Sequence, residues 1–247
     1  MKDNTSLNLS WNRLDMKSVD ELIKIMSNIP STITSLNLNG NSLEVKSGDE
    51  LAQIISAIPS TIIFLDLSNN GLGHKSGDEM SKILSATPSS ISSLNFGSKS
   101  LSLYKKSKAE WIQILPAIPS KINSLDLSWN KLNKKSVDEL NKIISNTSDT
   151  ITSLNLSWNH LYMKSVNEWC QIMSNIPSKI NSLDLSGNSL GKKSIDELAQ
   201  IMSNIPSTII FLDLSNNGLE VKSGVDLVKV IYSLPSTITF FNLCLND

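Results

Sequence analysis

The sequence has little of what disulfide-stabilised, nucleic-acid-binding and membrane-spanning proteins require. Its two cysteines, Cys170 and Cys244, lie far apart in the sequence and form no disulfide or metal-binding pattern. Such sparse cysteine use suits a reducing compartment. The net charge of −1 gives no indication of binding to nucleic acid or to an anionic membrane. No apolar run reaches about 18 residues, and the N-terminus lacks the charged, then apolar layout of a signal peptide. We therefore expect a soluble chain without membrane insertion.

Catalytic and cofactor motifs are also missing from the sequence. The two histidines, His74 and His160, stand alone without the spacing of metal ligands. Neither a phosphate-binding glycine loop nor a Gly-x-Ser-x-Gly segment occurs, and the many Ser and Asp residues fall on periodic positions. A nucleophile needs an oriented base within reach, which this pattern does not provide. We predict that the chain is not an enzyme and has no catalytic residues, metal or cofactor.

What the chain does contain is one motif, Leu-x-Leu-x-x-Asn-x-Leu, which recurs nine times with changes in the fourth and ninth copies. Its first position falls at residues 7, 36, 65, 94, 125, 154, 183, 212 and 241, at intervals of 29 residues with a single interval of 31. Such a period is typical of a solenoid, in which each unit buries its apolar face against its neighbours. We treat residues 1–247 as a single repeat domain, with repeats that start near residues 4, 33, 62, 91, 122, 151, 180, 209 and 238.

Each repeat begins with the pattern of a short strand. In the second copy, Leu36 and Leu38 alternate with Ser35, Asn37 and Asn39, which predicts a strand with one buried face. The Asn that follows can bond to backbone groups at the turn, and neighbouring copies can form a ladder. The predicted ladder comprises Asn12, Asn41, Asn70, Asn130, Asn159, Asn188, Asn217 and Asn246.

Each repeat continues with the pattern of an amphipathic helix. Ser47 and Glu50 form a capping box, in which each side chain bonds to the other residue's backbone N–H. Behind the cap, apolar residues fall at helical spacing, namely Leu51, Ile54, Ile55 and Ile58. Pro59 then ends the helix. The alternation of strand and helix predicts an α/β solenoid with a parallel sheet of about nine strands on the concave face and about eight helices on the convex face.

This motif resembles that of the leucine-rich repeat family, and the 29-residue period with a full helix resembles its ribonuclease-inhibitor-like class. The resemblance covers essentially the whole chain and implies a horseshoe-shaped solenoid. It is specific for fold and says little about function.

The chain also contains a longer repeat, which spans several of the 29-residue units. Residues 58–72 recur letter for letter as residues 205–219, and residues 6–12 recur as 153–159, both 147 positions later. The chain therefore reads as a five-repeat block copied once and truncated, so that copies one to four correspond to copies six to nine. Differences between matching residues show where the two copies have diverged, as in Leu22 and Trp169.

The fourth repeat departs from the pattern. Lys99 replaces the ladder Asn, two residues are inserted within 101–106, and Pro116 stands where the helix should continue. One interpretation is a decayed repeat, which arrays tolerate because contacts are between nearest neighbours. The other is a protruding functional loop at residues 102–108, with Tyr104 and three lysines.

The outward positions of the predicted sheet are mostly Ser, Asn and Asp, with a few aromatic residues among them. Trp129 and Trp158 hold the same place in adjacent repeats, just before the ladder Asn, so we expect them to be neighbours. Either their rings merely cover the turn, or they belong to a partner-binding patch, since exposed Trp is favoured in binding hot spots. The candidate patch comprises Trp129, Trp158, Lys131, His160, Asp126, Asn155, Asp184, Phe211 and Phe240.

Lysines form a further row just ahead of the caps, beside a row of acidic residues. Mixed rows of opposite charge are typical of a solvated rim, and we expect these lysines to be exposed. The row comprises Lys17, Lys46, Lys75, Lys135, Lys164, Lys193 and Lys222.

We predict from these features a non-catalytic protein–protein interaction module. The wording Ile-Pro-Ser-x-Ile-x-Ser-Leu-Asp-Leu-Ser-x-Asn resembles leucine-rich-repeat effectors that intracellular bacterial pathogens deliver through type IV secretion. The resemblance implies a bacterial protein that is secreted into the host cytoplasm and binds a host protein there. Alternatives are a structural adaptor that forms homo-oligomers through uncapped ends, and a substrate-recognition arm of a larger enzyme such as a ubiquitin ligase.

Overall fold

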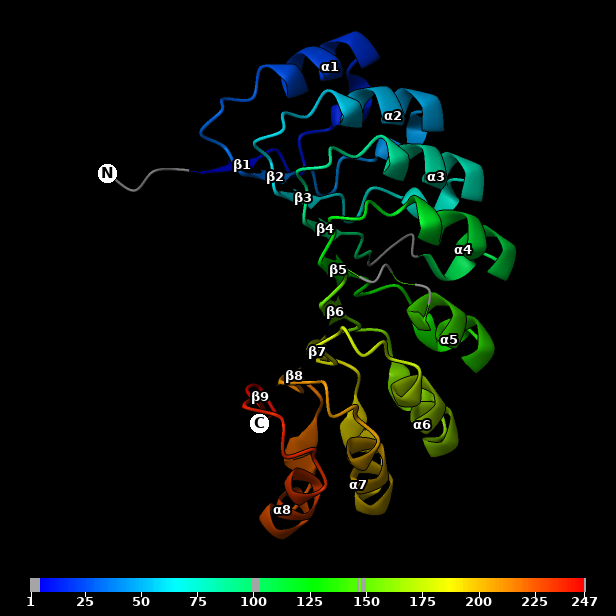
Figure 1. The fold of residues 1–247 in the computed structure, drawn as a ribbon, viewed down its shortest axis with the longest axis vertical. Coiled ribbons are helices and arrows are strands. Elements are labelled where there is room, and N and C mark those ends of the chain that lie inside the picture. The colour runs from blue at the N-terminus through cyan, green and yellow to red at the C-terminus, as the bar shows by residue number, and fades with distance from the viewer. Residues whose placement is uncertain (1–4, 99–102, 146, 148–149, 247) are drawn as a thin grey trace. The chain divides into compact units, whose positions relative to one another are not determined.

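A computed structural model describes residues 5–98, 103–145, 147 and 150–246 of the chain. The chain divides into two compact units, Met1–Asp126 and Leu127–Asp247, and each is described by itself. Both units repeat the same order of strand, short 3-10 helix and α-helix (Figure 1).

The strands of each unit are three residues long and pair in parallel with their neighbours in chain order. Leu36 lies between Leu7 and Leu65, so corresponding residues of successive repeats are aligned. The strands of the first unit are β1 (Ser6–Asn8), β2 (Ser35–Asn37), β3 (Phe64–Asp66), β4 (Ser93–Asn95) and β5 (Ser124–Asp126). The strands of the second unit are β6 (Ser153–Asn155), β7 (Ser182–Asp184), β8 (Phe211–Asp213) and β9 (Phe240–Asn242).

The α-helices lie on one side of each sheet (Figure 1). In the first unit they are α1 (Val19–Ser27), α2 (Gly48–Ser56), α3 (Gly77–Ser85) and α4 (Lys108–Ile114). In the second they are α5 (Val137–Ser145), α6 (Val166–Ser174), α7 (Ile195–Ser203) and α8 (Gly224–Tyr232). Within the described residues, no helix is long and apolar enough to cross a membrane.

The expected capping boxes are confirmed. The backbone N–H of Glu168 donates to Ser165 Oγ over 3.3 Å, and the Ser165 N–H donates to the Glu168 carboxylate over 2.7 Å. The helix end predicted at Pro116 is also confirmed, because α4 stops at Ile114 and a 3-10 turn, Leu115–Ala117, follows it.

The core is a set of aliphatic columns between strands and helices. In the seventh repeat, Leu183, Leu185, Leu190, Leu198 and Ile201 are all fully buried. Burying one such side chain contributes about 1.5–3 kcal/mol before conformational entropy is subtracted. The second unit also buries Trp169 completely, and its indole N–H donates to the Leu161 carbonyl over 3.1 Å.

The ladder asparagines join successive repeats through their side-chain amides. Asn188 Oδ1 accepts from the backbone N–H groups of Asn159 and Leu161, at 3.0 and 3.1 Å. Its Nδ2 donates to the carbonyls of Leu156 and Leu185, both at 3.0 Å. Each amide therefore satisfies turn backbone in two repeats that strand pairing leaves unpaired.

The expectation of a solvated lysine row was wrong. Lys75, Lys135 and Lys164 are only 6–7% exposed. The ammonium group of Lys164 donates to the Lys135 carbonyl one repeat earlier, over 2.5 Å, and lies 3.5 Å from its own capping-box Glu168. A buried ammonium needs such partners to offset its lost hydration. The row is therefore a second inter-repeat ladder, which runs behind the helix caps.

Candidate functional site

The turns after β5, β6 and β7 hold the residue before the ladder Asn in a left-handed backbone conformation. Trp129 and Trp158 have φ of 60° and 56°, and Gly187 takes the same place in the next repeat with φ of 63°. Left-handed backbone costs a non-glycine residue about 1–2 kcal/mol. The two tryptophans hold this conformation at a strain that glycine would avoid.

The two indole rings stack on each other. Their centroids are 4.5 Å apart and their planes differ by 3°, which confirms the expected proximity of Trp129 and Trp158. The Trp158 ring in turn lies over Gly187, where an added Cβ would meet the ring atoms within 3 Å. Both tryptophans are half-buried, so the stack offers an aromatic edge to a partner.

A similar arrangement occurs in the first unit without a second ring. Trp11 has φ of 57°, is 72% exposed, and its ring lies over Gly40. Trp11 therefore shares the turn and the glycine contact of Trp158 but has no counterpart of Trp129, the tryptophan of the preceding repeat.

The other turn candidates belong to the same edge of the second unit. Lys131 and His160 follow the ladder Asn and are left-handed, with φ of 51° and 57°. His160 is exposed and Lys131 is half-buried. Asp126 closes β5 in the first unit, so the candidate site of the second unit is built without it.

Strand-face carboxylates and amides of the second unit are fixed by bonds to the following backbone. The Ser186 N–H donates to Asp184 Oδ1 and the Ser215 N–H to Asp213 Oδ1, each over 2.8 Å. Asn155 accepts from the Ser157 N–H in the same way. Asp184 and Asp213 are partners in the strand register. Burial raises the pKa of Asp184, and the Asp213 carboxylate beside it adds to the rise.

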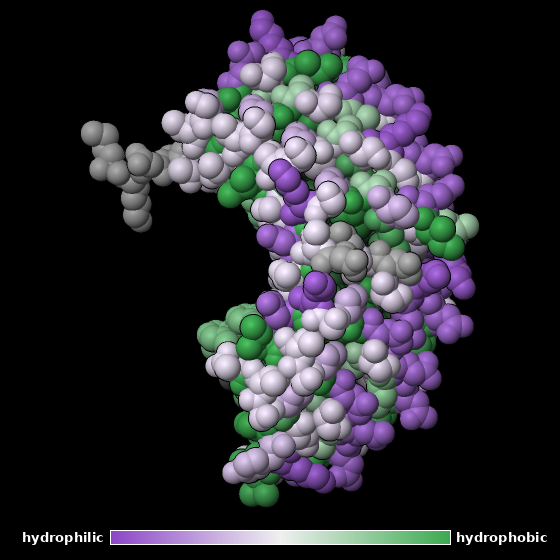
Figure 2. Space-filling model, viewed as in Figure 1, coloured by the Kyte–Doolittle hydropathy of each residue, from purple (hydrophilic) through white to green (hydrophobic). Residues whose placement is uncertain are grey.

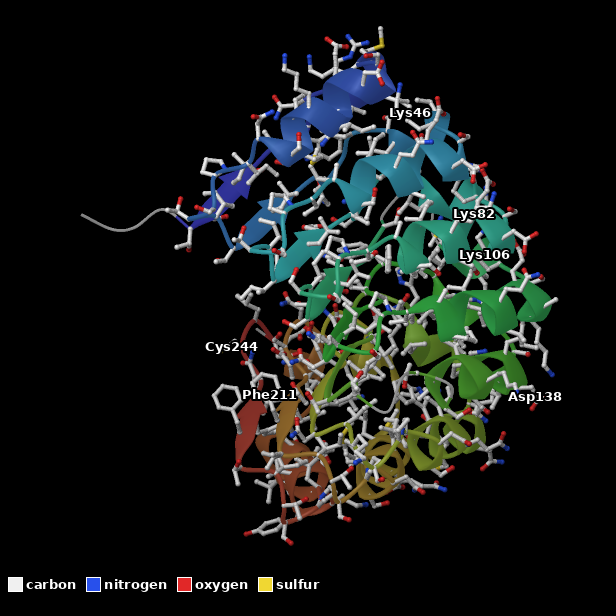
Figure 3. All side chains as sticks on the ribbon, turned by 45° about the horizontal axis from the view of Figure 1, so that its top comes forward. Lys46, Lys82, Lys106, Asp138, Phe211 and Cys244 are labelled. Atoms are coloured by element: carbon white, nitrogen blue, oxygen red, sulfur yellow. The ribbon has the colours of Figure 1, made fainter. Side chains whose placement is uncertain are left out.

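The two predicted phenylalanines form a second aromatic pair. Phe211 and Phe240 stack with centroids 4.7 Å apart and planes 7° apart. They open β8 and β9, whereas Trp129 and Trp158 follow the ends of their strands, so the aromatic pairs lie at opposite ends of the strands. Figure 2 shows the apolar patch over β8 and β9, and Figure 3 shows Phe211 on the side away from the helices.

The sequence interpretation did not include the stacking of these phenylalanines or the pairing of Asp184 with Asp213. Both pairs stand 29 residues apart at one strand position, so the period itself carried that signal.

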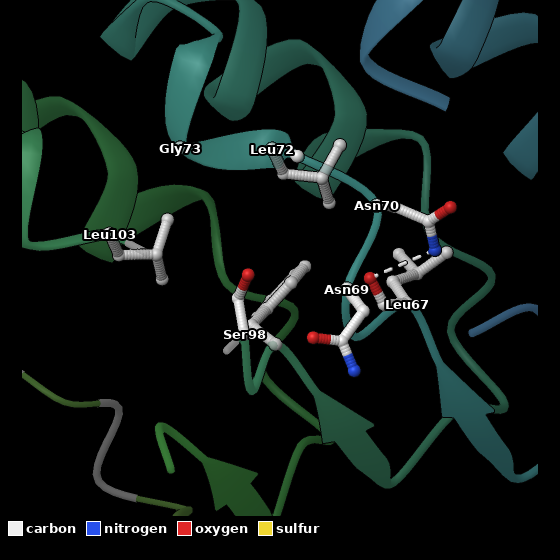
Figure 4. A pocket seen from close by; sticks show the side chains of 9 residues that line it. Leu67, Asn69, Asn70, Leu72, Gly73, Ser98 and Leu103 are labelled. Atoms are coloured by element: carbon white, nitrogen blue, oxygen red, sulfur yellow. Dashed lines mark hydrogen bonds between the residues drawn. The ribbon is translucent and has the colours of Figure 1, made fainter. Parts of the chain in front are cut away.

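Two of the cavities in the described part of the chain adjoin the turns that follow the strands. A cavity of about 10 Å³ in the first unit is lined by Asn70, Leu72, Phe96 and Ser98, among others (Figure 4). It has room for a single water molecule. In the second unit, an open depression of about 260 Å³ is lined by Gly191, Lys192 and Asn216, among others. The described residues contain no group of three or more His, Cys, Asp or Glu that could hold a metal.

The predicted loop at residues 102–108 is only partly described. Lys99, Ser102 and the side chain of Tyr104 lie outside the described part. Lys106, one of the three lysines of this loop, is buried to 3% exposure and lies 3.3 Å from Glu110. Lys106 therefore pairs with the capping-box glutamate of its own helix, as Lys164 does with Glu168, and does not extend into solvent.

Comparisons with known proteins agree on the repeat. Residues 179–201 match the model of the Leucine Rich Repeat family. The chain is similar to the solved structure of the leucine-rich repeat-containing protein LegL7 from Legionella pneumophila, with a TM-score of 0.91 and 39% identity over 98% of this chain and 73% of that one. The tropomodulin C-terminal domain of Caenorhabditis elegans gives a TM-score of 0.30 and 10% identity over 88% of this chain and 92% of that one, too low to support an argument. A search of curated proteins found no match.

Proposed function

Because this chain belongs to the leucine-rich repeat family, we propose that it is a non-catalytic protein-interaction module and, more specifically, a bacterial effector that binds a host protein. The fold supports the first part, since a rigid array of strands presents a long surface for a partner. The similarity to a Legionella protein supports a bacterial origin. Delivery into the host cytoplasm is the finer part of the proposal.

The Trp129–Trp158 stack is the observation that carries the proposal. Two large, half-buried rings occupy left-handed positions at which Gly187 stands in the next repeat. Rigid aromatic side chains supply contact area at low entropic cost and are enriched in binding hot spots. Lys131 and His160, on the same turns, complete a rim that combines aromatic and basic groups.

The test is affinity capture of host proteins on the immobilised chain, followed by measurement of binding to the main captured protein. We expect Trp129→Ala and Trp158→Ala each to weaken binding about 30-fold, the size of a hot-spot loss. Trp11→Ala is the matched control, because it removes the same residue from the same turn of the first unit and should leave binding unchanged. Circular dichroism verifies that all variants remain folded. Equal binding by wild type and both stack variants would refute the proposal.

A self-associating adaptor is the second candidate, and the outer surface of α8 favours it. Val225 and Tyr232 are 82% and 86% exposed, and Val228 is 49% exposed. Apolar groups exposed together on one helix favour association. Sedimentation at increasing concentration would then show growing mass, whereas a strict monomer excludes this candidate.

A further inference from the structure

We propose that the face of β7–β9 is a subsite for an arginine side chain carried on an extended segment of the protein partner. The inference rests on the proposed function, because it names the chemistry of the partner, but it rests on a different surface. Its elements are the stacked Phe211–Phe240 pair and the adjacent carboxylates of Asp184 and Asp213.

The geometry places these four side chains on one patch. Phe211 and Asp213 are the first and third residues of β8, so they share one face of the strand and stand about 7 Å apart along it. Asp184 on β7 is the register partner of Asp213, about 4.8 Å away across the sheet. Phe240 on β9 is the register partner of Phe211.

The aromatic part of the patch is open to solvent. Phe240 is 54% exposed, Ile210 beside it is 42% exposed, and Phe211 is half-buried. Each ring of this stacked pair keeps one outer face, and a planar cation can stack on such a face.

The charged side chains of the patch are all acidic. The first and third residues of β6–β9 include two carboxylates and no Lys or Arg. Asn242 Nδ2 donates to Asp213 Oδ2 over 2.8 Å, which orients that carboxylate. The backbone N–H groups of Ser186 and Ser215 donate to the Oδ1 atoms of Asp184 and Asp213, respectively. Burial, together with the neighbouring Asp213 charge, raises the pKa of Asp184, so a cation placed against this pair would be favoured.

Comparison of the two copies of the duplicated block shows which two residues distinguish this patch from the matching surface of the first unit. Each strand-face residue of β6–β9 matches one of β1–β4 that lies 147 positions earlier, and Phe64 and Asp66 match Phe211 and Asp213. The eight matched positions differ at only two, where Ser93 corresponds to Phe240 and Asn37 to Asp184. Both differences adjoin the same Phe-Leu-Asp strand, one adding the second ring and the other the second carboxylate.

Arginine fits this combination better than lysine does. Its guanidinium is planar, stacks on aromatic faces and donates in a fork that matches a carboxylate. An ammonium offers a compact charge without a stacking face. An extended segment is the natural carrier, because it can lie across the strands and present one side chain to the patch.

The experiment uses the full chain and a peptide probe, acetyl-Gly-Ser-Gly-Arg-Gly-Ser-Gly-amide, followed by NMR shifts of the ¹⁵N-labelled backbone. We expect the Ser186 and Ser215 amides, which bond to the two carboxylates, to shift on titration. The same peptide with citrulline, the neutral isostere, should bind at least about tenfold more weakly. The lysine peptide should also bind more weakly than the arginine peptide.

Variants that restore the residues of the first unit provide the decisive comparison. Asp184→Asn and Phe240→Ser should each weaken the arginine peptide roughly fivefold. Asp66→Asn and Phe64→Ser are the matched controls, since Phe64 has only Ser35 and Ser93 as register partners, and should change nothing. Equal binding of the citrulline or lysine peptide, or unchanged binding by Asp184→Asn, would overturn the inference. Partner capture that needs Trp129 but tolerates Asp184→Asn and Phe240→Ser would leave the proposed function standing and remove only this subsite.

Discussion

Asp184 carries a carboxyl group where the matching residue of the first unit is the neutral Asn37. Its pKa lies above the ordinary 3.8, because of burial first and the Asp213 charge second. A carboxyl whose pKa is raised by folding disfavours the folded state once it ionises. This cost is absent below the unfolded pKa, grows as pH rises through the window between the two values, and is complete above the folded value.

We therefore expect Asp184→Asn to stabilise the chain at neutral pH by up to about 0.5 kcal/mol. Urea unfolding at pH 7 and at pH 3 measures this, and the gain should vanish at pH 3, where wild-type Asp184 is protonated in both states. A loss of stability at pH 7 would contradict the prediction. A half-buried carboxylate that lowers stability is more readily explained by binding than by folding.

At the scale of elements, the lysine ladder links the start of one helix to the start of the next. We expect Lys164→Met to destabilise the second unit by about 2 kcal/mol, because the Lys135 carbonyl loses its donor and Glu168 loses its ion pair. Lys134→Met is the matched control, since Lys134 is exposed, and should change stability by less than about 0.5 kcal/mol. Thermal unfolding measures both, and equal behaviour of the two variants would show that the ladder contributes nothing.

The elements themselves could be predicted because their signals are local. Alternating leucines, the Ser165–Glu168 type of cap and Pro116 each act within a few residues, and the structure confirms the strands, caps and helix ends they predict. The burial of Lys164 could not be read in this way. Lysine is ordinarily exposed, and the carbonyl that receives its ammonium belongs to a residue 29 positions earlier.

The candidate site, too, was predictable only in part. The proximity of Trp129 and Trp158 followed from the period alone, because both stand at one position of adjacent repeats. The grouping of Phe211 with those tryptophans did not follow, since residues that open and residues that follow a strand lie at opposite ends of it. Strand direction, and not only repeat number, decides which candidates can touch one partner group.

At the scale of the whole chain, the capping boxes make stability depend on pH. Backbone N–H groups of the cap serines lower the pKa of Glu21, Glu50, Glu79, Glu168 and Glu197 below the ordinary 4.5. A carboxylate with a lowered pKa stabilises the fold above its unfolded pKa, and this contribution is lost as pH falls through the folded value.

We expect the urea midpoint of unfolding to be constant from pH 7 to about pH 5 and to fall steadily below 4.5. Because the same group recurs in successive repeats, the decline should be steeper than one carboxylate can give. Glu168→Gln is the internal check, as it should reduce the slope without removing it. A midpoint that stays flat to pH 3 would disprove the role of the caps.

The glycine beneath Trp158 has a further consequence for how aromatic rings are distributed along the array. Gly187 has φ of 63° and Trp158 has φ of 56°, so the next turn already holds the backbone that an indole needs. Because an added Cβ at residue 187 would meet the Trp158 ring within 3 Å, Gly187→Trp would first have to displace that ring. The column would then lengthen from two rings to three, with a spacing set by the strand separation of about 4.8 Å. The turns of successive repeats thus provide equivalent backbone positions, at which aromatic groups can be placed at regular intervals along the sheet.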